Sequence, residues 1–315
     1  MFRLQVLESV DSTNEVIKRA IEDDEPEGLA IRAYRQTGGY GRQGRAWKSP
    51  RGGMYESILL RPEVEMRELP TLALVVAIAV RRALASLVGD DQARRICIKW
   101  PNDVVLVGGD FGADCSTRDT ALELGGHTPC SDSSALENSP VGCSRRAELR
   151  AAHARQAQGL QASQANAPSI KSLYSKLAGI SSEVHAGGIC VGIGVNVEPP
   201  EDAMEIGGKN APAYLADLGF GFTCEREAAI NAVGDAVLHE FEPLYRRWCD
   251  GGFAALSGEF AEHSMLEGRF VRMANQLGEV VCEGTVRGVD ASGRLLLRLE
   301  DSETKAVASG EVHLL

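Results

Sequence analysis

A glycine- and arginine-rich segment, residues 36–45, is the first part of the chain whose residue types could bind an anion. Its glycines let backbone N–H groups approach a phosphate closely, and Arg42 and Arg45 add fixed positive charge. The segment has neither the lysine and hydroxyl ending of a P-loop nor the glycine spacing of a dinucleotide fingerprint. By itself it is more typical of a surface turn than of a nucleotide site.

Further segments place polar side chains where predicted strands and helices begin or end. They are Asp11-Ser12-Thr13-Asn14, Lys99-Trp100-Pro101-Asn102-Asp103, Lys176-Leu177-Ala178-Gly179-Ile180 and Gly192-Ile193-Gly194-Val195-Asn196. Each also has an ordinary structural explanation. Ser12 and Thr13 could cap a helix, and Asn102 could form a turn. Lys99 could end a strand in solvent, and Trp100 is more typical of a core residue.

The hydrophobic pattern that must position these segments alternates between strand-like and helix-like runs. Strands are expected over residues 2–6, 29–33, 57–61, 96–100, 104–107, 180–184 and 189–195. Helices are expected after an N-cap at residues 11–12, over residues 71–88 behind Pro70, and over residues 225–250. The pattern predicts an α/β (α+β) domain with a mixed central β-sheet flanked by helices.

Two composition changes divide the chain. Residues 108–169 are rich in Ser, Ala, Gly, Gln and Cys and bury too little apolar surface to offset their ordering entropy, so they are expected to form a largely disordered insertion. Short alternating strands are expected over residues 269–274, 280–289, 294–299 and 306–312, which suits a small β-barrel. We therefore expect a catalytic domain over residues 1–262 and a barrel over residues 263–315.

Composition also narrows the class of protein. Lys and Arg number 33 against 44 Asp and Glu, a net charge of -11 that argues against nucleic-acid or anionic-membrane partners. No signal peptide is visible, and the apolar run at residues 72–80 is shorter than the roughly 20 residues of a spanning helix. The eight cysteines form no CxxC pair and are expected to be free thiols of a cytoplasmic protein.

Taken together and in order, the polar segments resemble the motifs of the biotin–protein ligases. Residues 36–47 resemble the family's GRGRxGRxW loop, and residues 11–14 its early Ser-Thr-Asn turn. Residues 99–103 match its KWPND motif, residues 176–180 its KLAGI motif and residues 192–196 its GIGxN strand. Residues 287–290 are similar to the start of its C-terminal barrel motif. The resemblance implies a class II synthetase-like catalytic domain followed by an SH3-like barrel.

The resemblance also implies an activity and the residues that carry it. The expected enzyme uses ATP and Mg²⁺ to convert biotin to biotinyl-5′-adenylate and transfers biotin to a lysine of a biotin carboxyl carrier protein or domain. The residues implied for biotin are Ser12, Thr13, Asn14, Gln36, Gly39, Tyr40, Gly41 and Gly179. Those implied for ATP are Arg42, Arg45, Trp47, Asn102, Asp103, Asn196 and Arg287, with Asp103 also holding Mg²⁺. Lys176 and Arg42 are the implied catalytic cations.

Two features depart from the family pattern. Tyr40 stands where the pattern usually has arginine, which removes one cation from the loop. Residues 108–169 stand where the family usually has a short hairpin turn, although loop-closure entropy grows slowly enough with length for such an insertion to be tolerated.

Other functions remain open at this point. A lipoate–protein ligase shares the fold, although the KWPND and KLAGI motifs with a C-terminal barrel favour biotin. A noncatalytic biotin sensor or transcriptional regulator is another hypothesis; many relatives carry an N-terminal helix-turn-helix for that task, whereas this sequence begins directly at the expected catalytic domain. A degenerate scaffold would have lost Lys176, which is present. A homodimer is possible.

Overall fold

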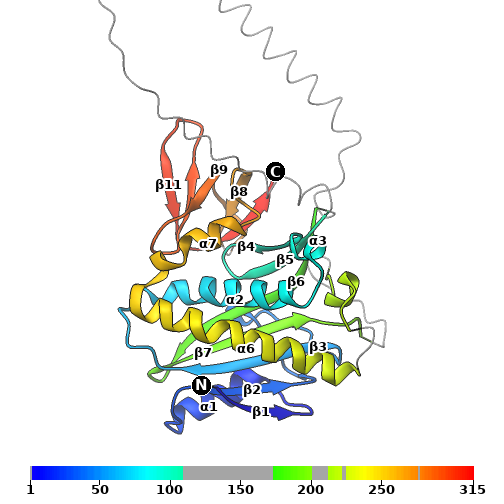
Figure 1. Ribbon diagram of the computed structural model, residues 1–315. Helices are drawn as coiled ribbons and strands as arrows, with labels where there is room; N and C mark the ends of the chain where they lie inside the picture. Colours follow the sequence, from blue (N-terminus) through cyan, green and yellow to red (C-terminus); the bar gives the residue numbers. More distant parts are fainter. Residues whose placement is uncertain (1, 109–172, 201–211, 222–224, 276) are drawn as a thin grey trace, which may run out of the picture. The chain divides into compact units, whose positions relative to one another are not determined.

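The computed structural model describes residues 2–108, 173–200, 212–221, 225–275 and 277–315 of the chain (Figure 1). They form a mixed seven-stranded sheet with helices on both faces and a five-stranded antiparallel sheet built from the end of the sequence. The mixed sheet and flanking helices expected from the sequence are confirmed. The expected insertion, residues 108–169, lies outside the described residues apart from Gly108. The division of the chain into a catalytic domain and a barrel at residue 262 stays a prediction.

The larger sheet has the order β1-β2-β3-β7-β6-β5-β4. Its strands are β1 (Arg3–Leu7), β2 (Leu29–Ala33), β3 (Gly53–Leu60), β4 (Ile96–Lys99), β5 (Asp103–Val107), β6 (Tyr174–His185) and β7 (Gly188–Asn196). Only the β1–β2 pair is parallel, and every other neighbouring pair in this sheet is antiparallel. The β4–β5 and β6–β7 hairpins agree with the strand pairs expected from the sequence, although β6 begins six residues earlier than expected.

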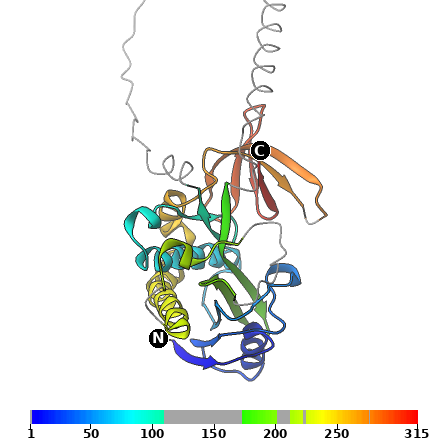
Figure 2. The ribbon, with the colours of Figure 1, turned by 90° about the vertical axis from the view of Figure 1, so that its right-hand side faces the viewer.

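Helices cover the two faces of this sheet unequally. The α-helices are α1 (Thr13–Glu22), α2 (Leu72–Ser86), α3 (Asp90–Ala93), α6 (Arg226–Gly251) and α7 (Ser257–Glu262). Short 3₁₀ helices are η1 (Arg42–Gly44), η2 (Leu69–Thr71), η5 (Leu215–Leu218) and η6 (Phe253–Ala255). Figure 2 shows α1 and α6 on opposite sides of the sheet. Helices α2 and α6 pack on each other over one face, and α1 packs on β2, β3 and β7 over the other.

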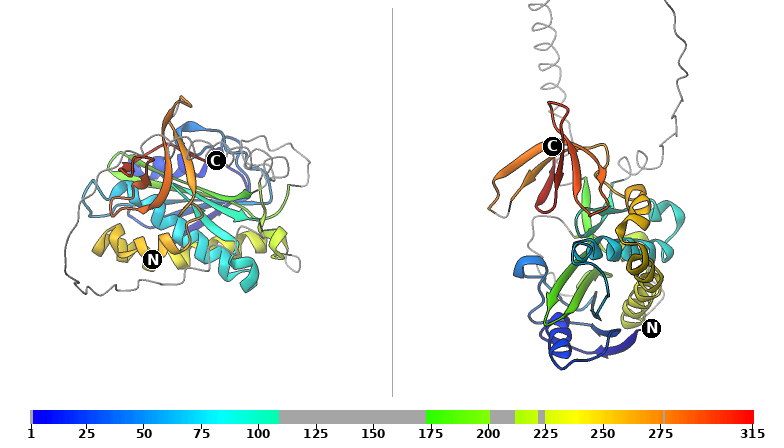
Figure 3. Two further views of the ribbon diagram at one scale, coloured as in Figure 1. Left: turned by 90° about the horizontal axis from the view of Figure 1, so that it is seen from above. Right: turned by 90° about the vertical axis from the view of Figure 1, so that its left-hand side faces the viewer.

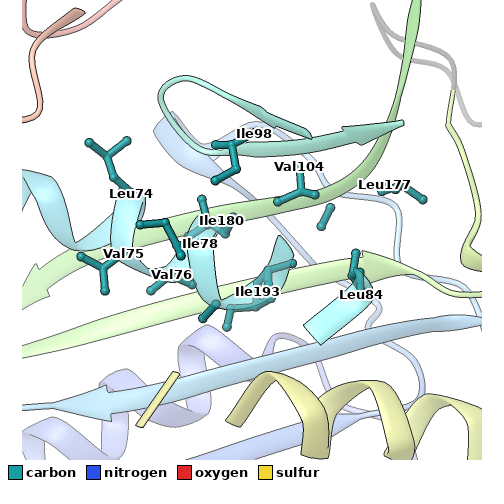
Figure 4. Packing of buried hydrophobic residues seen from close by; sticks show 14 of the residues in the cluster. Leu74, Val75, Val76, Ile78, Leu84, Ile98, Val104, Leu177, Ile180 and Ile193 are labelled. Atoms are coloured by element: carbon teal, nitrogen blue, oxygen red, sulfur yellow. The ribbon is translucent and has the colours of Figure 1, made fainter. Parts of the chain in front are cut away.

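Strand alternation explains how one sheet supplies two cores. Ile31, Leu59 and Cys190 point toward α1 and pack with Ile17 and Ile21. Their neighbours along the same strands belong to the larger core under α2 and α6. Figure 4 shows that larger core at close range, where aliphatic side chains of α2 meet those of β4, β5, β6 and β7.

The apolar helix at the centre of the larger core is longer than the run considered from the sequence. Leu69–Ser86 has the length and mean hydropathy, 1.6, of a helix that could cross a membrane, and it is the one such candidate among the described residues. Ten residues of α2 are buried, however, between the sheet and α6. Burial in this core accounts for the apolar character of the helix.

The C-terminal strands have the order β11-β10-β9-β8-β12, all antiparallel (Figure 3). They are β8 (Phe270–Ala274), β9 (Val280–Val289), β10 (Leu295–Arg298), β11 (Thr304–Val307) and β12 (Glu311–Leu314). The prediction of a single strand over residues 306–312 is wrong, because two strands, β11 and β12, share this region. Gly310, with φ of 145°, lies between two short strands, and β11 and β12 occupy opposite edges of the sheet.

A buried ion pair ties the larger sheet to α6. Arg32 of β2 donates from Nε to Glu56 Oε2 of β3 at 2.7 Å, and both side chains are almost completely buried. The Nη1 atom of Arg32 also donates to Asp235 Oδ1 of α6 at 3.0 Å. The guanidinium lies against Gly234, where an added Cβ would come within 2.3 Å of Arg32 Cζ. The absence of a side chain at residue 234 therefore lets α6 approach the sheet.

This packing predicts an unusual effect of an alanine in a helix. Glycine to alanine normally stabilises a helix interior, but Gly234→Ala is expected to destabilise the protein by about 1–3 kcal/mol, because the buried guanidinium is held in place and cannot yield. Urea denaturation measures the change. Gly258→Ala in α7 is the matched control, since its Cβ would meet nothing within 4 Å, and it should be neutral or stabilising. Equal effects at the two positions would contradict the packing argument.

Candidate active site

A cavity of about 980 Å³ lies over the α1 face of the sheet. Its walls come from the 36–47 segment, the β4–β5 turn, β6, β7 and the C-terminal sheet. Of the residues implied by the family resemblance, those that line it are Thr13, Asn14, Gln36, Tyr40, Gly41, Arg42, Arg45, Trp47, Asn102, Asp103, Lys176, Gly179 and Asn196. The fold therefore gathers most of the predicted site into one place, from segments far apart in the sequence.

Three predicted residues do not line the cavity. Ser12 is buried at the N-cap position of α1, but its side chain makes no capping hydrogen bond. Gly39 closes the base of the 36–47 segment, because an added Cβ would lie 2.4 Å from Ser49 Oγ. Arg287 is exposed on β9. Their roles in binding stay predictions.

Glycines of β7 form the floor of the cavity. Gly192 and Gly194 face the α1 side of the sheet, while Val191, Ile193 and Val195 point into the larger core. A Cβ at residue 192 would come within 2.3 Å of Asn14 Oδ1, and one at residue 194 within 2.8 Å of Trp47 Nε1. The missing side chains let Asn14 and Trp47, which both line the cavity, pack directly on the strand.

A β-bulge in β6 turns two of the predicted site residues, Lys176 and Gly179, to the cavity side of the sheet. Val104 pairs with Ala178 and Val105 with Lys176, so Leu177 is an extra residue in the ladder. Leu177 and Ala178 are both fully buried in the core, and Lys176 and Gly179 both face the cavity. The bulge therefore aims the Lys176 side chain into the site.

Lys176 is the best-defined cation of the cavity. Its Nζ donates to Asp103 Oδ1 of β5 at 2.7 Å and lies 4.9 Å from the centroid of the Trp47 ring. Asn196 Nδ2 donates to the Lys176 backbone oxygen at 3.0 Å, which fixes the strand at this point. The ammonium group is thus held in place before any ligand arrives.

A second cation reaches the same region from the 36–47 segment. Arg42 Nη1 donates to Asn102 Oδ1 at 3.0 Å, and Asn102 Nδ2 donates to the Ile180 backbone oxygen at 2.7 Å. Burial is the main cause that lowers the pKa of Arg42, with nearby Asp103 acting in the opposite direction. An arginine remains charged under such conditions, so the group is a partly desolvated cation suited to a phosphate.

The opposite end of the cavity is polar but uncharged. Gln36 Oε1 accepts from the Thr13 backbone N–H at 2.8 Å, and Gln36 Nε2 donates to Ser49 Oγ at 2.9 Å. Ser57 Oγ lies 2.7 Å from Asn14 Oδ1. Amide and hydroxyl groups arranged in this way can both donate to and accept from a neutral polar ligand group.

One polar atom in the wall is left without a partner. Trp47 Nε1 is buried and has no hydrogen-bond acceptor among the described residues. A buried N–H group without an acceptor is costly, and Trp47 lines the cavity. This atom lies against Gly194 of β7, where an added Cβ would come within 2.8 Å of it.

The structure adds a residue that the sequence interpretation left as a solvated strand end. Lys99 is 8% exposed, lines the cavity, and has its Nζ 5.6 Å from the Tyr174 ring centroid. Burial lowers the pKa of Lys99, with Asp103 opposing this effect and Lys176 adding to it. Its position inside the KWPND motif was the available signal, but burial of a lysine at a strand end depends on tertiary contacts.

Residues of the C-terminal sheet also line the cavity and were missed from the sequence. They are Asn275, Gly278, Gly310, Glu311, Val312, His313 and Leu314. Arg45 forms an ion pair with Glu311 of β12, and Trp100 Nε1 donates to the Gly293 backbone oxygen at 2.9 Å. The β12 edge is thus part of the site.

The cavity offers a carboxylate to a metal ion whose other ligands are water molecules and phosphate oxygens. No group of three His, Cys, Asp or Glu side chains suited to a metal occurs among the described residues. Asp103 supplies a carboxylate in the cavity beside Lys176. Mg²⁺ commonly binds through one or two carboxylates plus water and phosphate oxygens, so Asp103 is compatible with a magnesium ion that arrives with a nucleotide.

The fold and the site define a class of protein. A solved biotin protein ligase from Aquifex aeolicus, in complex with biotin and ATP, matches with a TM-score of 0.64 at 23% identity and covers 100% of this chain and 99% of its own. The fold is therefore that of the biotin protein ligases. Residues 6–112 match the biotin/lipoate A/B protein ligase family, and residues 268–315 match the biotin protein ligase C-terminal domain.

Curated relatives match over different lengths. The bifunctional ligase/repressor BirA of Bacillus spizizenii is 34% identical over 100 residues, which is 31% of this chain and 30% of that protein. The match thus spans less than a third of that relative. The biotin--[acetyl-CoA-carboxylase] ligase of Mycobacterium tuberculosis is 24% identical over 98% of this chain and 88% of its own length.

The burial of Lys99 predicts opposite effects of one substitution on stability and binding. Since burial lowers the pKa of Lys99, the folded state carries a penalty for the charged form that is present at neutral pH and fades as pH rises toward the unfolded value of 10.5. Lys99→Met is therefore expected to need more urea to unfold at pH 7, and its advantage should shrink at high pH. Its affinity for inorganic pyrophosphate should fall by about tenfold.

Denaturation curves between pH 7 and pH 10 and calorimetric titration with pyrophosphate provide the two measurements. Lys305→Met, on β11 outside the cavity, is the control and should change neither property. A Lys99→Met protein that is less stable yet binds pyrophosphate normally would assign Lys99 a structural role.

Proposed function

We propose that this protein activates biotin with ATP to form biotinyl-5′-adenylate and transfers the biotin to a lysine of a biotin carboxyl carrier protein. The observation that carries the proposal is the convergence of Lys176, Arg42 and Asp103 above a floor of glycines. The matches to the biotin/lipoate A/B protein ligase family and to the biotin protein ligase C-terminal domain support it, as do the biotin and ATP in the name of the Aquifex aeolicus complex.

The first step requires two anions to meet. A biotin carboxylate oxygen attacks the α-phosphorus of ATP, a phosphorus–oxygen bond forms, and pyrophosphate leaves with the electron pair of the broken bond. Lys176 and Arg42 reduce the repulsion between the two anions and stabilise the charge that develops on the phosphoryl oxygens. Both side chains are already held by Asp103 and Asn102, so little reorganisation accompanies the reaction.

Magnesium bound to Asp103 would supply further positive charge at the phosphates. The chain's own residues provide the orientation. Lys176 stays between Asp103 and the Trp47 ring, and Asn102 holds Arg42 over the same region.

The second step is attack by the acceptor lysine. Its neutral amine adds to the carbonyl carbon of the mixed anhydride, the bond to AMP breaks, and an amide forms with release of a proton. No enzyme nucleophile is required. Lys176, held by Asp103 at 2.7 Å, is therefore assigned an electrostatic role.

The polar end of the cavity supports biotin as the activated acid. The Thr13 hydroxyl, the Gln36 amide and the Asn14 amide can pair with the ureido group of biotin. Lipoate, the other substrate class of the family, has no such group. A cytoplasmic location, a carrier-domain partner and a possible homodimer complete the proposal, in keeping with the bacterial biotin ligases among its relatives.

The reaction itself is the first test. Purified protein with ATP, Mg²⁺ and biotin should produce biotinyl-5′-adenylate and pyrophosphate, and should label one lysine of a biotin carboxyl carrier domain. Lipoate should react at least about 10²-fold more slowly, because the amide and hydroxyl groups near Gln36 would lack a partner. Mass spectrometry measures the adenylate and the labelled lysine. Equal turnover of lipoate would reject the biotin assignment.

Removal of the central cation is a second test. Lys176→Ala should lower the rate of adenylate formation by at least about 10²-fold, the scale of losing a transition-state electrostatic partner, with a much smaller change in biotin affinity. Single-turnover kinetics measure the first quantity and equilibrium titration the second. Lys305→Ala should behave like the unaltered protein. Near-normal adenylate synthesis by Lys176→Ala would contradict the proposed mechanism.

A further inference from the structure

The 36–47 segment contains a short hairpin whose two arms line the cavity. Trp47 N–H donates to the Gly39 backbone oxygen at 2.9 Å, and Gly41 N–H donates to the Arg45 backbone oxygen at 2.8 Å. Tyr40 forms an isolated antiparallel bridge with Ala46. We call residues 39–47 the ligand hairpin. Because it carries so many cavity residues, its position determines how well the cavity retains a ligand.

Tyr40 fastens this hairpin to α1. Its hydroxyl donates to Glu15 Oε1 at 2.5 Å and accepts from Lys18 Nζ at 2.8 Å. The same ammonium lies 5.1 Å from the centroid of the Tyr40 ring and 2.7 Å from Glu183 Oε2 of β6. The Tyr40 hydroxyl is thus part of a network, Glu15–Tyr40–Lys18–Glu183, that joins the hairpin to a helix and to the sheet.

The charge states of this network are suited to an anchor. Burial and the hydrogen bond to Glu15 raise the pKa of Tyr40 to about 12, so the hydroxyl keeps the proton it donates. Burial alone would lower the pKa of Lys18, but its bonds to Glu183 and Tyr40 outweigh that effect and raise it. The hydrogen bond from Tyr40 is the main cause that lowers the pKa of Glu15. At neutral pH Tyr40 is therefore protonated and neutral, Lys18 is positively charged and Glu15 is negatively charged.

The other attachments of the hairpin use groups that face the cavity. Arg42 is bound by Asn102 and Arg45 by Glu311, and all four residues line the cavity. These contacts therefore lie within the region where a phosphate would bind. Glu15, Lys18 and Glu183, in contrast, do not line the cavity, so a ligand can bind without breaking the Tyr40 network.

We propose that Tyr40 is a positioning residue that clamps the ligand hairpin to α1 and slows the escape of biotin and of its adenylate from the cavity. The proposal rests on the proposed function, since it takes biotin as the ligand. Tyr40 stands where the family pattern usually has arginine. In this chain the hydroxyl, through Glu15 and Lys18, supplies the attachment.

Tyr40→Phe tests the clamp with the smallest change, because the ring and its contact with the Lys18 ammonium remain. Loss of a hydrogen bond to charged partners should raise the dissociation rates of biotin and of preformed biotinyl-5′-adenylate by about tenfold. The KM for biotin should rise with little change in kcat, because the hydroxyl does not act on the reacting atoms. Stopped-flow displacement and steady-state kinetics provide these readouts.

Variants outside the cavity distinguish a clamp from a direct ligand contact. Lys18→Met and Glu15→Ala should reproduce the faster dissociation, because each breaks the network without removing a cavity side chain. Tyr34→Phe is the matched control, since its hydroxyl accepts from Asn231 Nδ2 and does not line the cavity, and its dissociation rates should be unchanged. Melting temperatures of Tyr40→Phe and Tyr34→Phe should be similar.

The outcomes separate this inference from the proposed function. If the unaltered protein does not bind biotin, the proposed function fails and the clamp fails with it. If it binds biotin but Tyr40→Phe releases it at the normal rate, only the clamp is overturned. If Tyr40→Phe releases the ligand fast while Lys18→Met and Glu15→Ala release it at the normal rate, the hydroxyl contacts the ligand directly and the clamp is also overturned.

Discussion

The two faces of β7 impose the constraint on which the rest of the molecule depends. Val191, Ile193 and Val195 must fill the core under α2 and α6, while Gly192 and Gly194 must leave space on the α1 side for two cavity-lining side chains, Asn14 and Trp47. A strand meets both demands because successive residues point to opposite faces. The same backbone therefore stabilises the domain on one side and forms the floor of the cavity on the other.

The site concentrates positive charge within an acidic chain. The net charge of the sequence is -11, yet the cavity wall contains Arg42, Lys99 and Lys176 with Asp103 among them. Cations in a partly buried site are costly without a counter-ion, and their interactions with an anionic ligand are correspondingly strong. Arrangement, and not total charge, makes this region suitable for a polyphosphate.

Much of the fold could be predicted because local patterns agree with the tertiary structure. The strand at residues 29–33, the β4–β5 hairpin around Pro101 and the long helix α6 all follow from periodicity and turn residues. The last strand could not be predicted correctly. β11 and β12 lie close in sequence and share a β-like composition, but they pair with different neighbours, and pairing is a non-local choice.

The sequence by itself determined the order of the motifs, the resemblance to the biotin–protein ligases and most of the residues that meet in the cavity. Only the tertiary structure decided which way their side chains point. The bulge at Leu177 turns Lys176 inward, burial converts Lys99 from a strand end into a site cation, and α1 supplies the partners of Tyr40. These outcomes depend on contacts between segments distant in the chain, whereas residue type and spacing report only on local conformation.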